Sequence, residues 1–179
     1  ALCDVDFSGS AKDSVANFPK AKLFADYRKM LEEMKEIDAV TISTPDHVHG
    51  PAAKFCMERG KHVYVQKPMT HNIREARLLT QLARDKKVVT QMGNQGASND
   101  GPRLLKEWYD AGLVGDVHTI YAWTDRPVLP QGIPWSANKA DVPKDLDWDL
   151  WLGPAAWRPY NPDLVHFNFR WVMDIGGGF

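Results

Sequence analysis

Strand-forming and helix-forming segments alternate along the first 115 residues, and this alternation most constrains the fold. Apolar or β-branched segments at 1–5, 38–44, 62–65 and 87–92 are separated by segments whose apolar residues have helical spacing. The short links between them imply parallel strands joined by right-handed crossovers. The sequence therefore predicts an α/β fold of the Rossmann type, with a parallel sheet.

The helical segments have recognisable ends and faces. Asp26 and Asn72 are placed to cap helices, and Pro102 lies in the first turn of a segment over 100–113. Gly60 ends the segment 47–59, where a helix often needs a left-handed residue. That segment places one stripe of residues on its inner face: His49, Ala52, Ala53, Cys56 and Met57.

The character of the chain changes near residue 115. The pattern over residues 116–125 predicts a longer strand with aromatic side chains, and the sequence beyond it is rich in Trp and Pro. We therefore predict two units, 1–115 and 116–179. Residues 1–5 read as the end of a strand and 176–179 as an unfinished turn, so we expect the chain to be an internal segment of a longer protein.

Composition excludes several function classes. The 179 residues carry a net charge of −1, with 44% hydrophobic and 25% charged residues, as in soluble globular proteins. Nothing in this balance favours a nucleic-acid or membrane partner. Cys3 and Cys56 lie in apolar segments without metal-type spacing, which indicates reduced core thiols and fits a cytoplasmic setting.

In a parallel sheet, ligands collect beyond the carboxyl ends of the strands. Asp4, the Thr44–Pro45 turn, Gln66–Lys67 and Gly93–Asn94 all fall at such ends. An acidic residue in the position of Asp4 accepts hydrogen bonds from adenosine ribose hydroxyls and repels a 2′-phosphate, which favours NAD over NADP. A solvated turn aspartate is the alternative, and Asp6 is a rival for the role.

The stretch "STPDHVHG", residues 43–50, ends one strand and begins the next helix. Asp46, His47 and His49 lie where backbone N–H groups favour anions or polar ligands, so a turn close to a cofactor is one interpretation. Plain helix capping is the second. A zinc site is the third, but it requires a further ligand, and no matching cluster is nearby. We therefore expect no metal.

Lys67 follows a buried strand and precedes Pro68, which fixes the backbone. Charged side chains are rarely buried unless they are paired or used. Burial at the strand end, together with a positive nicotinamide ring in front of it, would favour the neutral amine needed for proton transfer. The alternative is a lysine whose amine reaches solvent at the rim of the sheet.

Taken together, these segments resemble the glucose–fructose oxidoreductase / inositol dehydrogenase / MocA (Gfo/Idh/MocA) family. The similarity covers nearly the whole chain and is carried, in order, by "DAVTISTPDHVHGPAAKFCMERGKHVYVQKPMTHNIREARLL", "VVTQMGNQ", "AGLVGDVHTI" and "DWDLWLGPA". The resemblance implies an NAD(P)-binding Rossmann domain over 1–115. It also implies the start of a substrate and oligomerisation domain over 116–179, with a large, mostly antiparallel sheet, both domains being incomplete.

By position, the resemblance implies that Lys67 is catalytic, beside the nicotinamide and the substrate hydroxyl. It implies cofactor contacts for a set of residues at the strand ends: Asp4, Thr44, Pro45, His47, His49, Gln66, Lys67, Pro68, Asn94 and Gln95. The cofactor would be NAD, with NADP as the alternative. The substrate would be a sugar, cyclitol or related polyol, with contacts from Lys67, Trp123, Arg126 and Arg158. The full-length protein is expected to form a homo-oligomer.

Two departures from the family pattern stand out. Gln66 replaces the family glutamate, and an amide holds the neighbouring lysine proton less strongly than a carboxylate does. The family's glycine-rich G-x-G-x-x-G loop and its Asp-x-x-x-His acid/base pair are expected before residue 1 and after residue 179. We therefore expect the isolated 179-residue chain to be inactive.

The function implied for the full-length protein is hydride transfer to or from a secondary hydroxyl. Two alternatives remain open: redox-neutral glycosidase, lyase or epimerase chemistry with tightly held NAD, and a non-catalytic NAD-binding sensor.

Overall fold

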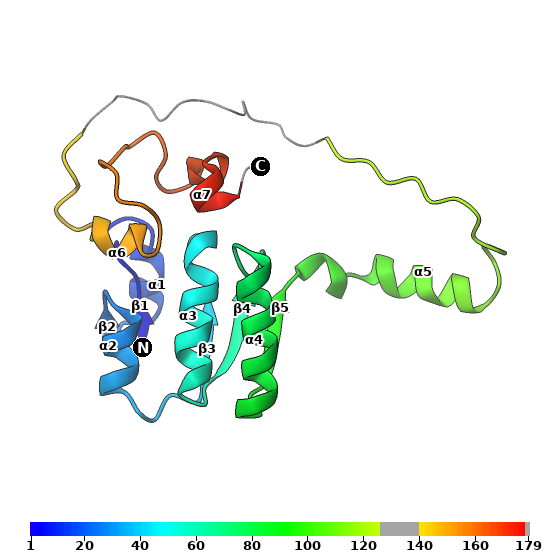
Figure 1. Ribbon diagram of the computed structural model, residues 1–179, viewed down its shortest axis with the longest axis horizontal. Helices are drawn as coiled ribbons and strands as arrows, with labels where there is room; N and C mark the ends of the chain where they lie inside the picture. Colours follow the sequence, from blue (N-terminus) through cyan, green and yellow to red (C-terminus); the bar gives the residue numbers. More distant parts are fainter. Residues whose placement is uncertain (126–139, 178–179) are drawn as a thin grey trace.

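The computed structural model describes residues 1–125 and 140–177, and its strands form two parallel sheets (Figure 1). In the first sheet, β1 (Leu2–Cys3) pairs with β2 (Leu23–Phe24). The second has the order β3 (Ala39–Ile42), β4 (His62–Gln66), β5 (Thr90–Gly93). The predicted parallel α/β architecture is confirmed.

The helices follow the predicted alternation in the first half of the chain. They are α1 (Lys12–Asn17), α2 (Tyr27–Glu33), α3 (Asp46–Glu58), α4 (Ile73–Lys86), α5 (Asp100–Asp110), α6 (Trp148–Leu152) and α7 (Met173–Gly176), with short 3-10 turns η1 (Gln95–Ser98) and η2 (Asn168–Trp171). Both predicted caps are confirmed, because Asp26 accepts from the Arg28 N–H and Asn72 from the Glu75 N–H. Among the described residues, no helix is long and apolar enough to cross a membrane.

The main core lies between α3, α4 and one face of the second sheet. The whole stripe predicted on α3 is buried, and it packs with Ile42, Val63 and Val65 from β3 and β4. Leu79 of α4 is buried in this core, whereas Ile73 is 73% exposed. Ile73 is the first residue of α4.

Strand register brings three strand ends to one edge. Ile42 lies opposite Val65, and Gln66 lies opposite Gly93. Because the three strands are parallel, the residues that follow them leave the sheet at the same edge. This edge is called the strand-end rim below.

A second core forms in the C-terminal segment and is attached to the first unit. Trp148 and Trp151 stack with ring centroids 4.8 Å apart, and both are buried, so these two tryptophans are packing residues. The Asp147 N–H donates to the Val5 carbonyl, 3.0 Å away, and His47 Nε2 lies 3.1 Å from the Trp151 carbonyl oxygen. The α6 segment therefore lies against the start of α3 and the chain after β1 (Figure 1).

The predicted strand over 116–125 is wrong for this structure, which assigns no strand there. After α5 the chain turns back and runs at a distance from the packed core (Figure 1), and Ile120 and Trp123 are 82% and 88% exposed. A strand requires a partner backbone, and the described residues supply none to this segment. The only antiparallel pairing in the described ranges is an isolated bridge between Asp6 and Leu146, so a large antiparallel sheet is not seen there.

The contact between His47 and α6 makes stability depend on pH. Burial lowers the pKa of His47 to about 4, although its hydrogen bond to the Trp151 carbonyl opposes the change. In the unfolded chain, His47 therefore takes up a proton below about pH 6.5. In the folded chain, it does so only below about pH 4. Stability from this group is present above that window and is lost as pH falls through it.

We expect His47→Gln to reduce this pH dependence. Between pH 7 and pH 4.5, the wild-type free energy of unfolding should fall by roughly 2 to 3 kcal/mol more than that of the variant. Urea denaturation of the intact protein at both pH values measures the difference. His118→Gln, at an exposed histidine, is the matched control and should follow the wild type. Equal pH dependence for His47→Gln and wild type would contradict the assignment.

Candidate active site

The strand-end rim collects polar side chains of the kinds predicted. Thr44 follows β3, Lys67 follows β4 and Asn94 follows β5, and all three are exposed. Gln95, the first residue of η1, is exposed as well. The rim thus presents a hydroxyl, an ammonium and two carboxamides from neighbouring strands to solvent.

Gly93 allows the side chain of Gln66 to lie across the end of β5. A Cβ atom at Gly93 would meet Gln66 Oε1 at 2.8 Å, so a larger residue there would displace the amide. Gln66 Oε1 accepts a hydrogen bond from the Lys67 N–H, 3.3 Å away. The residue that replaces the family glutamate is therefore held beside the backbone of Lys67.

Lys67 is exposed, which differs from the expectation that burial would favour its neutral form. Its charge acts instead on Asp46, the first residue of α3, which is only 8% exposed. Burial raises the pKa of Asp46, and the nearby charges of His49, Arg170, Lys67 and His71 act in the opposite direction. The sequence alone did not identify Asp46 as the acidic group facing Lys67.

His47 and His49 are both buried, although both were predicted near a cofactor. His47 contacts the Trp151 carbonyl, and its Nδ1 has no hydrogen-bond partner among the described residues. His49 contacts the carbonyl oxygens of Thr44 and Pro68 through its two ring nitrogens. Both rings are therefore used to join segments of the protein, and Thr44 and Pro68 themselves are exposed.

Asp4 and Asp6 have different roles in the turn after β1. Asp6 is 7% exposed and accepts the Gly9 N–H at 2.8 Å, and one of its oxygens lies 2.9 Å from His166 Nε2. Burial would raise the pKa of Asp6, but these contacts lower it overall. Asp4, which is partly buried, accepts the Asp6 N–H and the Ser10 hydroxyl through one oxygen, Oδ1. Asp6 therefore builds the turn, and Asp4 remains the candidate for ribose contact.

Of the predicted substrate contacts, Trp123 and Arg158 lie on different segments of the described chain. Trp123 is in the exposed segment after α5, and Arg126 lies outside the described residues. Arg158 is partly buried, and its guanidinium pairs with the carboxylate of Asp174 in α7. Arg158 is thus positioned by the C-terminal segment, whereas Trp123 lies in the segment that follows α5.

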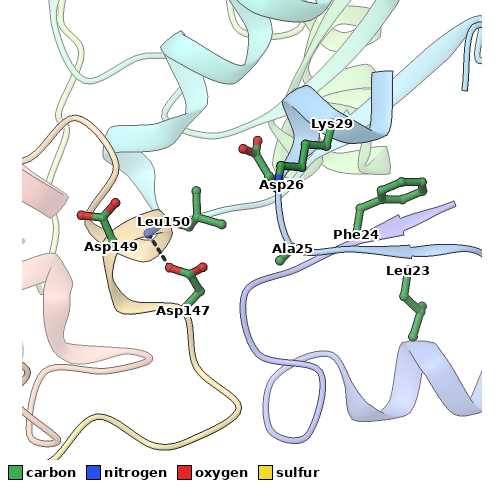
Figure 2. Close-up of a pocket in the computed structure, with 8 residues that line it drawn as sticks. All are labelled: Leu23, Phe24, Ala25, Asp26, Lys29, Asp147, Asp149 and Leu150. Carbon is green, nitrogen blue, oxygen red and sulfur yellow. Dashed lines mark hydrogen bonds between the residues drawn. The ribbon is translucent and has the colours of Figure 1, made fainter. Parts of the chain in front are cut away.

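A cavity of about 500 Å³ lies between the β2–α2 turn and α6 (Figure 2). Two of its three acidic side chains, Asp26 and Asp147, have structural roles: Asp26 caps α2 and pairs with Arg28, and Asp147 caps α6. None of the residues predicted for the site lines it. This cavity therefore does not coincide with the strand-end rim.

The described ranges contain neither an ionised thiol nor a cluster of metal ligands. Cys3 and Cys56 are free, and burial raises the pKa of the first to about 12 and of the second to about 11, so both thiols stay protonated. Among residues 1–125 and 140–177, no three His, Cys, Asp or Glu side chains gather as metal ligands.

The rim has the chemistry that a nicotinamide nucleotide requires. Asp4 can accept from ribose hydroxyls, and the side chains of Thr44, Lys67 and Asn94 offer donors and acceptors to hydroxyl and carboxamide groups. All of these side chains are at least partly open to solvent. The residues present therefore fit such a group.

Comparison with known proteins agrees with this geometry. A model described as an oxidoreductase family with an NAD-binding Rossmann fold matches residues 2–94, just over half of the chain. A model for the oxidoreductase family's C-terminal alpha/beta domain matches residues 115–179.

Individual relatives are similar over part of their length. The chain is 30% identical to dTDP-3,4-didehydro-2,6-dideoxy-alpha-D-glucose 3-reductase of Streptomyces violaceoruber, over 65% of this chain and 32% of that protein. It is 24% identical to levoglucosan dehydrogenase of Pseudarthrobacter phenanthrenivorans, over 73% and 34%. The crystal structure of an NAD binding oxidoreductase from Klebsiella pneumoniae is 29% identical, with a TM-score of 0.55, over 64% and 30%.

The matched region is thus about a third of the length of these relatives. With one family model covering more than half of the sequence and a second covering the C-terminal segment, the chain belongs to the Gfo/Idh/MocA family of oxidoreductases.

Proposed function

We propose that the intact protein is an NAD-dependent oxidoreductase that transfers hydride to or from a secondary hydroxyl of a sugar, cyclitol or related polyol. The observation that carries this proposal is the register of β3, β4 and β5, which places Thr44, Lys67 and Asn94 on one rim. The names of the two curated relatives, a sugar-nucleotide reductase and a sugar dehydrogenase, support the substrate class.

In this proposal, the chain's own residues bind and orient. Asp4 holds a ribose of the nucleotide, and its negative charge favours NAD over NADP. Thr44, Asn94 and Gln95 border the nicotinamide, which supplies hydride chemistry when the nucleotide is bound. His47 and His49 are buried and do not contact the nucleotide directly. Instead, their rings contact backbone carbonyls, and those of His49 belong to Thr44 and Pro68.

Lys67 is the residue that contacts the reacting group. Its ammonium donates a hydrogen bond to the substrate oxygen and stabilises the negative charge that develops there as the hydroxyl proton leaves. Exposure of Lys67 leaves its amine accessible to substrate, and Asp46 supplies a nearby opposite charge. Arg158, fixed by Asp174, and Trp123 are proposed substrate contacts from the second unit.

We expect Lys67→Met in the intact protein to retain NADH binding and to lower kcat/KM by roughly 10²- to 10⁴-fold. NADH fluorescence titration and turnover with a panel of sugars and cyclitols give the two readouts. Lys86→Met, at an exposed lysine in the last turn of α4, is the matched control and should match the wild type.

Four outcomes would count against the proposal. Turnover by Lys67→Met close to that of wild type would remove Lys67 from the chemistry. Failure of the wild type to bind NADH would exclude nucleotide use altogether. Binding without turnover, for any substrate in the panel, would favour a sensor, and product formed without net nucleotide reduction would favour the redox-neutral alternative.

We further expect Gln66→Glu to move the alkaline limb of the pH profile of kcat/KM to higher pH. A carboxylate beside Lys67 stabilises the ammonium, so a higher pH is needed to release the proton. Gln91→Glu adds the same charge to β5 opposite Tyr64, two residues before the rim, and should shift the profile less. An alkaline limb that is unchanged or lower in pH for Gln66→Glu would contradict the role given to residue 66.

A further inference from the structure

His49 joins the two turns that border the proposed lysine. Its ring is 1% exposed. Nδ1 lies 2.6 Å from the carbonyl oxygen of Pro68, in the turn after β4, and Nε2 lies 2.8 Å from the carbonyl oxygen of Thr44, in the turn after β3. One side chain from α3 therefore bridges the exits of two neighbouring strands.

The protonation state of this ring follows from its partners. A carbonyl oxygen only accepts hydrogen bonds, and a neutral imidazole carries a single N–H. With a neutral His49 ring, one of the two contacts would bring a nitrogen lone pair against an oxygen lone pair at under 3 Å. Both contacts are hydrogen bonds only when both ring nitrogens carry protons.

A buried cation is costly unless it is paired and hydrogen-bonded. Asp46, three residues earlier on α3, is the buried acidic group that faces His49. Lys67 after β4, His71 before α4 and Arg170 of η2 also face Asp46, and their positive charges compete with His49 for it. The two short hydrogen bonds and the charge of Asp46 therefore favour the charged His49 ring. Burial and the three positive neighbours oppose it.

His47 offers an internal contrast on the same helix. It is buried to a similar degree, but only Nε2 has a carbonyl partner, and Nδ1 has none among the described residues. Burial lowers the pKa of His47 to about 4, so this ring is neutral near pH 7. Two histidines two residues apart thus differ in their carbonyl partners, with one nitrogen in contact for His47 and both for His49.

We propose that His49 is a positioning residue that acts as an imidazolium, tying the Thr44 turn to the Pro68 turn and thereby fixing the backbone that carries Lys67. The part of this proposal that concerns Lys67 rests on the proposed function. The doubly protonated ring does not, because it follows from the two carbonyl contacts alone. Loss of one proton would release one of the two turns.

Nitrogen-15 NMR of histidine-labelled intact protein tests the ring directly. The His49 signals are assigned by their loss in His49→Gln, and those of His47 by their loss in His47→Gln. At pH 7 we expect protons on both ring nitrogens of His49 and on Nε2 alone of His47. A single neutral tautomer for His49 at pH 7 would overturn the proposal, whatever the activity of the protein.

Kinetics test the link to Lys67. We expect His49→Gln to lower kcat by roughly 10- to 100-fold while the dissociation constant for NADH changes little. In the wild type, activity should also fall over the pH range in which NMR shows His49 losing its second proton, and this loss should be absent in His49→Gln. His118→Gln, at an exposed histidine, should match the wild type.

The outcomes separate the two proposals. If His49 is doubly protonated but His49→Gln retains full kcat, the ring does not position Lys67 and the proposed role is wrong. If His49→Gln does not fold, the wild-type NMR spectrum and its pH titration against activity still decide both parts. If the wild type does not bind NADH, the proposed function fails, and the NMR result still decides the state of the ring.

Discussion

The parallel hydrogen-bond register of β3, β4 and β5 is the constraint on which the rest of this structure depends. It buries Ile42, Val63 and Val65 against α3 and α4, and it fixes which residues leave the sheet together. A slip of one residue in this pairing would exchange the buried and exposed faces of a strand. Core packing and the composition of the rim therefore have one cause, since the same apolar side chains that specify the register also align the three turns.

The first turn of α3 connects this sheet to the C-terminal segment. Within four residues, Asp46 faces the charge of Lys67, His47 contacts the carbonyl of Trp151, and His49 bridges two strand exits. Such a dense use of polar side chains below a surface is expected where a site has to be held in one geometry. Gly153, with φ of 50°, ends α6 close to Val48, so the two segments approach each other at a left-handed glycine.

Much of the first unit could be predicted because its signals are local. The α3 stripe, the Asp26 and Asn72 caps and the left-handed Gly60 each follow from spacing within a few residues. The strand expected over 116–125 shows the limit of this reasoning. Alternation of apolar residues records a tendency to pair, but the pairing itself needs a second backbone, which no local pattern supplies.

The sequence by itself determined the order of the longer strands and helices up to residue 110, the residue types at the strand ends and the family resemblance, because periodicity and motifs are local properties of the chain. Only the tertiary structure decided which of those residues have structural roles and which are exposed at the rim. It separated Asp6, which builds a turn, from Asp4, and it placed two histidines of the "STPDHVHG" stretch under the rim instead of on it. It also left Lys67 exposed, with Asp46 as its acidic neighbour. Burial and charge depend on distances between segments far apart in the chain, and these distances exist only once the chain has folded.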